Sequence, residues 1–275
     1  MLRGEVTPGP GVEQLPEVAA GPRLVAAGLT DFVRTESTVE VVGGSAWAGP
    51  PGAPLQRLRA VGSSEWPAAL AVSGDRVAVL VAHRTRERAR PRLVIRDAQS
   101  GGERVRRLSR FTAPFVALAG PYVATMHQRG VQDRTVVVVR NARTWRTRTR
   151  VVVNEDSLDV RAALGRDGGL AIASGFLRYK ATRVAPGGRP RTLRPRPSAL
   201  AIDIGANGAV YPRRGRRGTR LIEVTRAGRV RALTAPMRGL VSFDADRARL
   251  ALRTRNCVYV SQVPALEVAP ACPQP

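Results

Sequence analysis

The feature that most constrains the fold is a short pattern that recurs six times along the chain. Each copy places small or polar turn residues ahead of an alternation of apolar side chains. The copies are GPRLVAA from Gly21, GDRVAVL from Gly74, GPYVATM from Gly120, DGGLAIA from Asp167, NGAVYPR from Asn207 and RARLALR from Arg247. Their apolar anchors are Leu24, Val77, Val123, Leu170, Val210 and Leu250, which lie 53, 46, 47, 40 and 40 residues apart. The chain is therefore expected to consist of six similar units.

Each unit has the pattern of four short strands separated by turns. In the second unit, AALAVS precedes Gly74, a strand opens at Val77, RLVIR surrounds Val94, and the turn DAQSGG from Asp97 leads into a last strand. A four-stranded antiparallel meander cannot bury both of its faces alone, so similar meanders stack on one another. Helical patterns are nearly absent, because 27 glycines and 21 prolines interrupt the chain. The sequence predicts an all-β fold, a β-propeller of six four-stranded antiparallel blades.

The end of the second and third units resembles a known repeat. The stretches VIRDAQSGGERVRRL from Val94 and VVVRNARTWRTR from Val137 resemble the WD-repeat and PQQ-type blades of the β-propeller repeat superfamily. The resemblance extends over Pro16 to Cys272 and implies architecture only. The chain has no Trp-Asp dipeptide or Gly-His pair, and nothing in it matches a quinone site, so no cofactor is expected.

The predicted boundaries follow from the first and last units. Residues 1–15 are expected to be an N-terminal linker or a truncated segment, residues 16–272 the propeller, and residues 273–275 a C-terminal tail. Because TPGPG near Pro8 looks like a cut linker, a seven-bladed propeller with a missing N-terminal blade is the alternative. A local alternative is a short capped helix in NEDSLDVRAALG, from Asn154.

The two cysteines suggest the compartment. Cys257 and Cys272 flank two strand-like pieces, and an antiparallel reversal near Pro264 would place them opposite each other. A disulfide between them favours an oxidising, extracytoplasmic environment. No secretory signal or membrane-spanning apolar stretch is visible, so a cytoplasmic protein is the alternative. A monomer is expected.

The charge of the chain is strongly positive, with 45 Lys and Arg against 21 Asp and Glu and a net charge of +24. Within each unit, basic residues concentrate in the loop between the second and third strands, and such loops share one rim of a propeller. The candidate rim residues are Arg84, Arg86, Arg88, Arg90, Arg129, Arg134, Arg178, Lys180, Arg213, Arg214, Arg216, Arg217 and Arg220. The alternative is that these are solvated loops of an arginine-biased chain.

Arginine binds phosphate, sulfate and carboxylate through two parallel hydrogen bonds, so the rim predicts an acidic protein or an anionic polymer as partner. Nucleic acid is less favoured because only 4% of the residues are aromatic and could stack on bases. Arg146, Arg148 and Arg150 alternate along a predicted outer strand, where charge discourages edge-to-edge aggregation.

No catalytic or metal constellation is evident. Asp159, Asp203 and Asp244 could converge on a calcium ion, but they are not at equivalent positions in their units. His83 and His127 have no carboxylate or cysteine at ligand spacing, and nucleophile-elbow and phosphate-loop motifs are absent. We expect a non-catalytic recognition or scaffold module. The alternatives are a nucleic-acid-binding protein and a propeller hydrolase or lyase acting on an acidic glycan, with Asp203 as base.

Overall fold

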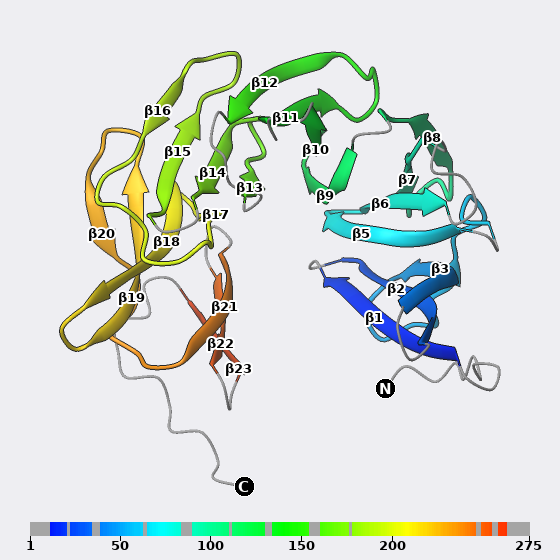
Figure 1. Ribbon diagram of the computed structural model, residues 1–275, viewed down its shortest axis with the longest axis horizontal. Helices are drawn as coiled ribbons and strands as arrows, with labels where there is room; N and C mark the ends of the chain where they lie inside the picture. The colour runs from blue at the N-terminus through cyan, green and yellow to red at the C-terminus, as the bar shows by residue number, and fades with distance from the viewer. Residues whose placement is uncertain are drawn as a thin grey trace, which may run out of the picture. The chain divides into compact units, whose positions relative to one another are not determined.

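The fold was established from a computed structural model. It describes residues 12–20, 23–34, 39–62, 65–83, 90–109, 112–129, 134–153, 160–175, 178–245, 249–254 and 258–262. Over these ranges the chain forms 23 strands and no helix, and hence no helix that could cross a membrane. The strands make six antiparallel sheets, five with four strands and one with three, each built from strands consecutive in the chain (Figure 1).

The first three sheets follow the predicted units. The first contains β1 (Val12–Ala20), β2 (Val25–Arg34), β3 (Val39–Gly49) and β4 (Gln56–Arg57). The second contains β5 (Glu65–Ser73), β6 (Arg76–His83), β7 (Arg92–Asp97) and β8 (Glu103–Arg107). The third contains β9 (Thr112–Ala119), β10 (Tyr122–Arg129), β11 (Arg134–Asn141) and β12 (Thr147–Val153).

The last three sheets repeat the order with shorter outer strands. The fourth contains β13 (Val160–Leu164), β14 (Leu170–Ser174), β15 (Lys180–Val184) and β16 (Pro190–Thr192). The fifth contains β17 (Asp203–Ile204), β18 (Gly208–Gly215), β19 (Gly218–Thr225) and β20 (Val230–Ala232). The sixth contains β21 (Leu240–Ala245), β22 (Arg249–Thr254) and β23 (Val258–Gln262).

The all-β, propeller-type repeat predicted from the sequence is thus confirmed, and six described sheets fit the six expected blades. Strand β1 begins at Val12, inside the segment expected to be a linker. The helix considered from Asn154 is wrong for residues 160–164, which form β13, and residues 154–159 lie outside the described ranges. The fourth strand predicted for the last unit, Cys257 and Cys272 also lie outside them.

The chain divides into two compact units, residues 1–129 with 136–147 and residues 130–135 with 148–275. Within each unit, the core lies between consecutive sheets. In β6, Val77, Val79 and Val81 pack in the cluster shared with the first sheet, whereas Ala78 and Leu80 pack in the cluster shared with the third. In β18, Tyr211 faces the fourth sheet and Val210 the sixth. Inner strands are therefore buried on both faces, which explains their valine-rich runs.

The turn between the third and fourth strands of these sheets contains, near its end, a residue whose backbone has a positive φ (the left-handed conformation). Gly101 has this role in the second sheet, with a φ of 67°, and Gly228 in the fifth, with a φ of 82°. In the third sheet the residue is Trp145, with a φ of 61°. A side chain costs about 1–2 kcal/mol in this conformation, so its own contacts must offset the strain.

The contacts of Trp145 come from the junction of the second and third sheets. The guanidinium carbons of Arg140 and Arg106 lie 5.1 and 5.9 Å from the centre of the indole ring. The indole also packs against the apolar cluster that contains Leu108 and Val123. Cation–π and apolar contacts together therefore hold a bulky residue where the turn favours glycine.

We expect both Trp145→Ala and Trp145→Gly to lower the free energy of unfolding, because each removes the indole contacts. Trp145→Gly should be the more stable of the two, by about 1 kcal/mol, because glycine adopts positive φ without strain. Urea unfolding followed by circular dichroism measures both values. An alanine variant at least as stable as the glycine variant would contradict a strained turn.

Candidate anion-binding surfaces

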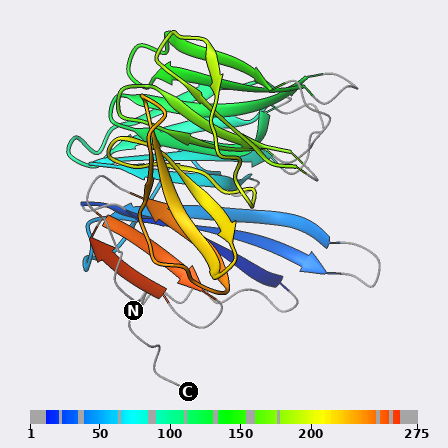
Figure 2. The same cartoon turned by 90° about the vertical axis from the view of Figure 1, so that its left-hand side faces the viewer.

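The largest described group of predicted rim residues lies on the β18–β19 hairpin. Pro212 and the residues before it on β18 are buried, whereas Arg213, Arg214 and Gly215 are exposed, so the hairpin continues beyond the packed part of the sheet (Figures 1 and 2). We call the group on this extension, Arg213, Arg214, Arg216, Arg217 and Arg220, the arginine hairpin; all five are exposed.

The register of the hairpin sets like charges side by side. Arg213 is paired with Arg220 across the two strands, and Arg216 and Arg217 form the turn between Gly215 and Gly218. Like charges directly opposite each other destabilise a strand pair. The hairpin is fixed instead by Met237, whose backbone exchanges hydrogen bonds of 2.9 and 2.8 Å with that of Thr219. A Cβ on Gly218, which has a φ of 131°, would lie 2.7 Å from the Met237 carbonyl oxygen, so this approach requires glycine.

A hollow of about 450 Å³ lies along this hairpin. Its lining consists of the five arginines of the hairpin, Gly215, Gly218 and the apolar residues Ile222, Val230, Ala232 and Pro236. Every lining residue is thus arginine, glycine or apolar. The hollow combines a strongly positive wall with an apolar floor, an arrangement that suits an anionic group carried on a larger body.

The other predicted rim residues are more scattered. Arg90, Arg134, Arg178 and Lys180 are exposed, and Lys180 has interactions of its own. Arg84, Arg86 and Arg88 lie outside the described residues, as does the side chain of Arg129. Of the predicted rim residues, the structure therefore places the five arginines of the hairpin around one hollow. A basic rim that extends over all the blades stays a prediction.

Several carboxylates in the described ranges accept hydrogen bonds from backbone amides as well as pairing with arginine. Glu223 is 1% exposed and accepts hydrogen bonds from the amides of Asn207 (2.7 Å) and Gly208 (3.1 Å) and from Arg231 (3.2 Å). Glu103 accepts from the amides of Arg59 (3.2 Å) and Ala60 (2.9 Å). Carboxylates used in this way hold turns and links in place, and the described ion pairs of Glu223 and Glu103 are with Arg231 and Arg96, neither of which belongs to the arginine hairpin.

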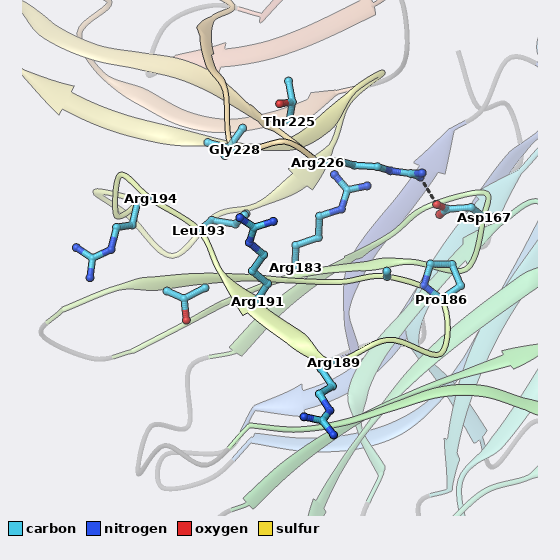
Figure 3. A pocket seen from close by; sticks show the side chains of 13 residues that line it. Asp167, Arg183, Pro186, Arg189, Arg191, Leu193, Arg194, Thr225, Arg226 and Gly228 are labelled. Atoms are coloured by element: carbon cyan, nitrogen blue, oxygen red, sulfur yellow. Dashed lines mark hydrogen bonds and ion pairs between the residues drawn. The ribbon is translucent and has the colours of Figure 1, made fainter.

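Sequence reasoning missed a second basic site, between the fourth and fifth sheets. A pocket of about 430 Å³ there is lined by Arg183, Arg189, Arg191, Arg194 and Arg226, with Asp167 as the one lining carboxylate (Figure 3). Arg183 and Arg191 are direct partners across β15 and β16. The available signal was Arg183 itself, an arginine inside β15, a third strand whose counterpart β7 is apolar and buried at Leu93, Val94 and Ile95.

Two of the aspartates considered for calcium do meet. The Asp203 carboxyl lies near enough to Asp244 for the two charges to interact, and its two oxygens accept hydrogen bonds from the amides of Ile204 (2.7 Å) and Ala245 (2.6 Å). Burial, together with the charge of Asp244, raises the pKa of Asp203 from 3.8 to about 7. Asp159 lies outside the described residues, and within those residues no group of three potential metal ligands occurs.

His127 has a structural environment. Its Nδ1 lies 3.1 Å from the Thr112 hydroxyl and its Nε2 lies 3.0 Å from the Thr125 hydroxyl, so both ring nitrogens are engaged. These contacts connect β9 to β10 and occupy the atoms that a metal or a substrate proton would need.

Comparison with known proteins supports the fold. No protein-family model and no curated protein sequence matches the chain. Among solved structures, an acylaminoacyl peptidase in complex with a chloromethyl ketone matches 94% of this chain and 46% of its own, at 9% identity and a TM-score of 0.64. The β-propeller domain of the Trilobed protease from Pyrococcus furiosus matches 92% of this chain and 81% of its own, at 9% identity and a TM-score of 0.61.

One of two prolyl endopeptidases analysed together also matches, over 95% of this chain and 43% of its own, at 13% identity and a TM-score of 0.59. The chain thus spans about half the length of these peptidases and most of the length of the Trilobed protease propeller domain. At identities this low the likeness concerns the fold alone. It confirms a divergent β-propeller-type repeat.

The Asp203–Asp244 pair predicts a pH dependence. The folded chain keeps a proton on Asp203 up to about pH 7, whereas the unfolded chain releases it near pH 3.8. This group's contribution to the free energy of unfolding is therefore full below about pH 4 and falls as the pH rises to about 7, by at most about 1.4 kcal/mol per pH unit.

Asp244→Asn removes the like charge, so it should lower the pKa of Asp203 and make the chain more stable than the parent at pH 8 but not at pH 4. Urea unfolding of both proteins between pH 4 and pH 8 measures this difference. Parallel pH profiles for the two proteins would contradict coupling between the two carboxyl groups.

Proposed function

We propose that this chain is a non-catalytic β-propeller recognition module that binds a negatively charged protein or polymer through the arginine hairpin. The observation that carries the proposal is the hollow along β18 and β19, which five exposed arginines line together with glycine and apolar residues. A planar guanidinium donates paired hydrogen bonds to carboxylate, sulfate or phosphate, and several on one rigid hairpin can bind successive groups of a polymer.

Electrostatics supports binding to an extended anion. The net charge of +24 produces a long-range attractive field, which salt screens over about 8 Å at physiological ionic strength. The hollow is lined by no aromatic side chain. Base stacking, which single-stranded nucleic acid binding uses, has no platform there. An acidic protein or a carboxylated or sulfated polymer is therefore favoured over nucleic acid.

A second candidate function, hydrolysis or elimination on an acidic glycan, is favoured by one observation. Burial and the charge of Asp244 raise the pKa of Asp203 to about 7, and pairs of carboxyl groups whose pKa values are separated in this way serve as general acid and base. Release of shorter products from polygalacturonate by the purified chain, lost in Asp203→Asn, would establish this activity. It would also overturn the non-catalytic proposal.

We further propose that the protein is monomeric and works outside the cytoplasm, with Cys257 and Cys272 joined as a disulfide. The support is that these are the two cysteines of the chain and that they flank a predicted reversal. Closing a loop of this size contributes about 3 kcal/mol, so reduction should lower the free energy of unfolding by about that amount. Thiol alkylation before and after reduction counts the free cysteines. Two reactive thiols in the unreduced, denatured protein would refute the disulfide.

The binding proposal makes a charge-matched prediction. The triple variant Arg213→Gln, Arg216→Gln and Arg217→Gln should weaken binding to heparin and polygalacturonate by about threefold to a hundredfold, because exposed charge pairs contribute about 0.2–1 kcal/mol each. The control is Arg146→Gln, Arg148→Gln and Arg150→Gln, which removes the same charge from exposed positions at β12.

Affinity measured by biolayer interferometry at several salt concentrations tests both variants. The hairpin variant should also show a shallower salt dependence, because fewer counterions are released on binding. Equal weakening in the two variants would mean that net charge alone attracts the polymer, and the hairpin would then have no specific role.

A further inference from the structure

We propose that the pocket between the fourth and fifth sheets is a binding site for a phosphoryl group, held by Arg183, Arg191 and Arg226. It is a site separate from the arginine hairpin, and its lining shares no arginine with the hollow along that hairpin. The inference therefore does not depend on the proposed function of the hairpin.

The three arginines come from different elements and line the same pocket, with Arg226 extending to Asp167 at its edge. Arg183 on β15 and Arg191 on β16 are cross-strand partners, so their side chains leave the same face of the sheet. Figure 3 shows both extending toward the turn of the fifth sheet that contains Arg226 and Gly228. Arg189 and Arg194 also line the pocket but point away from this centre.

The positive charge in the pocket is incompletely neutralised. Asp167 accepts hydrogen bonds from Arg226 and, at 3.0 Å, from the amide of Gly169, so its charge is engaged by the next sheet and by its own turn. The nearby carboxylate of Glu223 is held by the amides of Asn207 and Gly208 and by Arg231. An anion in the pocket would therefore neutralise positive charge that the described carboxylates do not fully neutralise.

Arg183 is the most informative member of the cluster. Its Nη1 is buried and has no hydrogen-bond partner among the described residues. Burial and the charge of Arg226 lower the pKa of this guanidinium. A buried donor without a partner destabilises the folded chain, so an oxyanion that accepts a hydrogen bond from Nη1 offsets an existing penalty. A general arginine bias explains exposed arginines and does not explain this one.

The equivalent junction between the second and third sheets shows why the pocket is open here. There, Trp145 fills the space beside Arg106 of the outer strand. The corresponding turn of the fifth sheet has Gly228 at the same left-handed position, where a Cβ would meet nothing within 4 Å. Glycine therefore leaves room for a ligand where the other junction has an indole.

The apolar part of the lining gives the ligand a second contact. Leu193, Val224 and Pro186 lie in the same pocket as the arginines. The volume of about 430 Å³ accommodates a small body attached to the charged group. Free inorganic phosphate and a phosphate monoester both carry the anionic oxygens that the arginines would bind. Two probes, one of each kind, distinguish between these ligands.

Isothermal titration calorimetry and thermal melting with inorganic phosphate and with phenyl phosphate test the site. We expect at least one probe to bind the parent chain and to raise its melting temperature. Tighter binding of phenyl phosphate would identify a monoester site with an apolar body, and equal binding a site for the free anion. Binding of neither probe would overturn the proposal.

Arg183→Gln and Arg191→Gln should each weaken binding about tenfold or more, because each removes a charge-assisted hydrogen bond. Arg194→Gln, which removes the same charge from a side chain that points away, should change the affinity less than about twofold. Equal losses in the Arg183 and Arg194 variants would overturn the assignment.

Stability without ligand separates binding from a structural role. Arg183→Gln should melt at or above the temperature of the parent chain, because it removes a desolvated charge beside Arg226, and it should lose the rise caused by the probe. A less stable variant that still shows the full rise would overturn the proposal. The triple variant of the arginine hairpin should keep its affinity for the probe; if it alone lost binding, the anion would lie on the hairpin.

Discussion

Burial of the inner strands on both faces is the constraint on which the rest of the structure depends. In β6, alternate residues pack into two clusters, one shared with the preceding sheet and one with the following sheet. Such a strand has no face available for charge, so a chain with 45 basic residues must place them elsewhere. They occupy outer strands such as β8 and β12, turns, and the extension of β18 and β19 beyond the core, whereas Arg183 on the inner strand β15 is an exception with a buried Nη1.

The excess positive charge is concentrated at particular surfaces, because several carboxylates hold turns and links in place. Glu65, which is 8% exposed, accepts from the amide of Gly62 at 2.8 Å and from Arg92, which in turn donates to the Ala60 carbonyl at 2.9 Å. Glu103 and Glu223 have similar roles. Since these acids hold links and turns, arginines gathered on the hairpin and in the pocket retain a positive field that a partner anion can use.

Two junctions between sheets illustrate how one turn geometry supports two outcomes. The left-handed position accepts Trp145 where an indole can contact Arg140 and Arg106, and it accepts Gly228 where no side chain is needed. The first junction is filled and contributes to packing, and the second leaves a basic pocket. A single residue in each turn therefore decides between a structural contact and a cavity.

The sequence by itself determined the class of fold, the order of strands within each sheet and the exposed arginines of the β18–β19 hairpin. These follow from local periodicity, turn residues and charge, which neighbours in the chain set together. The helix considered from Asn154 fails for residues 160–164 because β13 pairs with β14 along its whole length, and that pairing overrides a local capping signal.

Only the tertiary structure decided which residues of different sheets meet. Asp203 and Asp244 occupy unequal positions in their units, and the charge of Asp244 nevertheless acts on the Asp203 carboxyl. Arg183, Arg191 and Arg226 line one pocket although no local pattern relates β15 to the turn of the fifth sheet. Contacts between sheets depend on how neighbouring faces pack and on which turn residue fills or leaves a space. That geometry comes from side-chain volume and stacking, which periodicity along the chain does not encode.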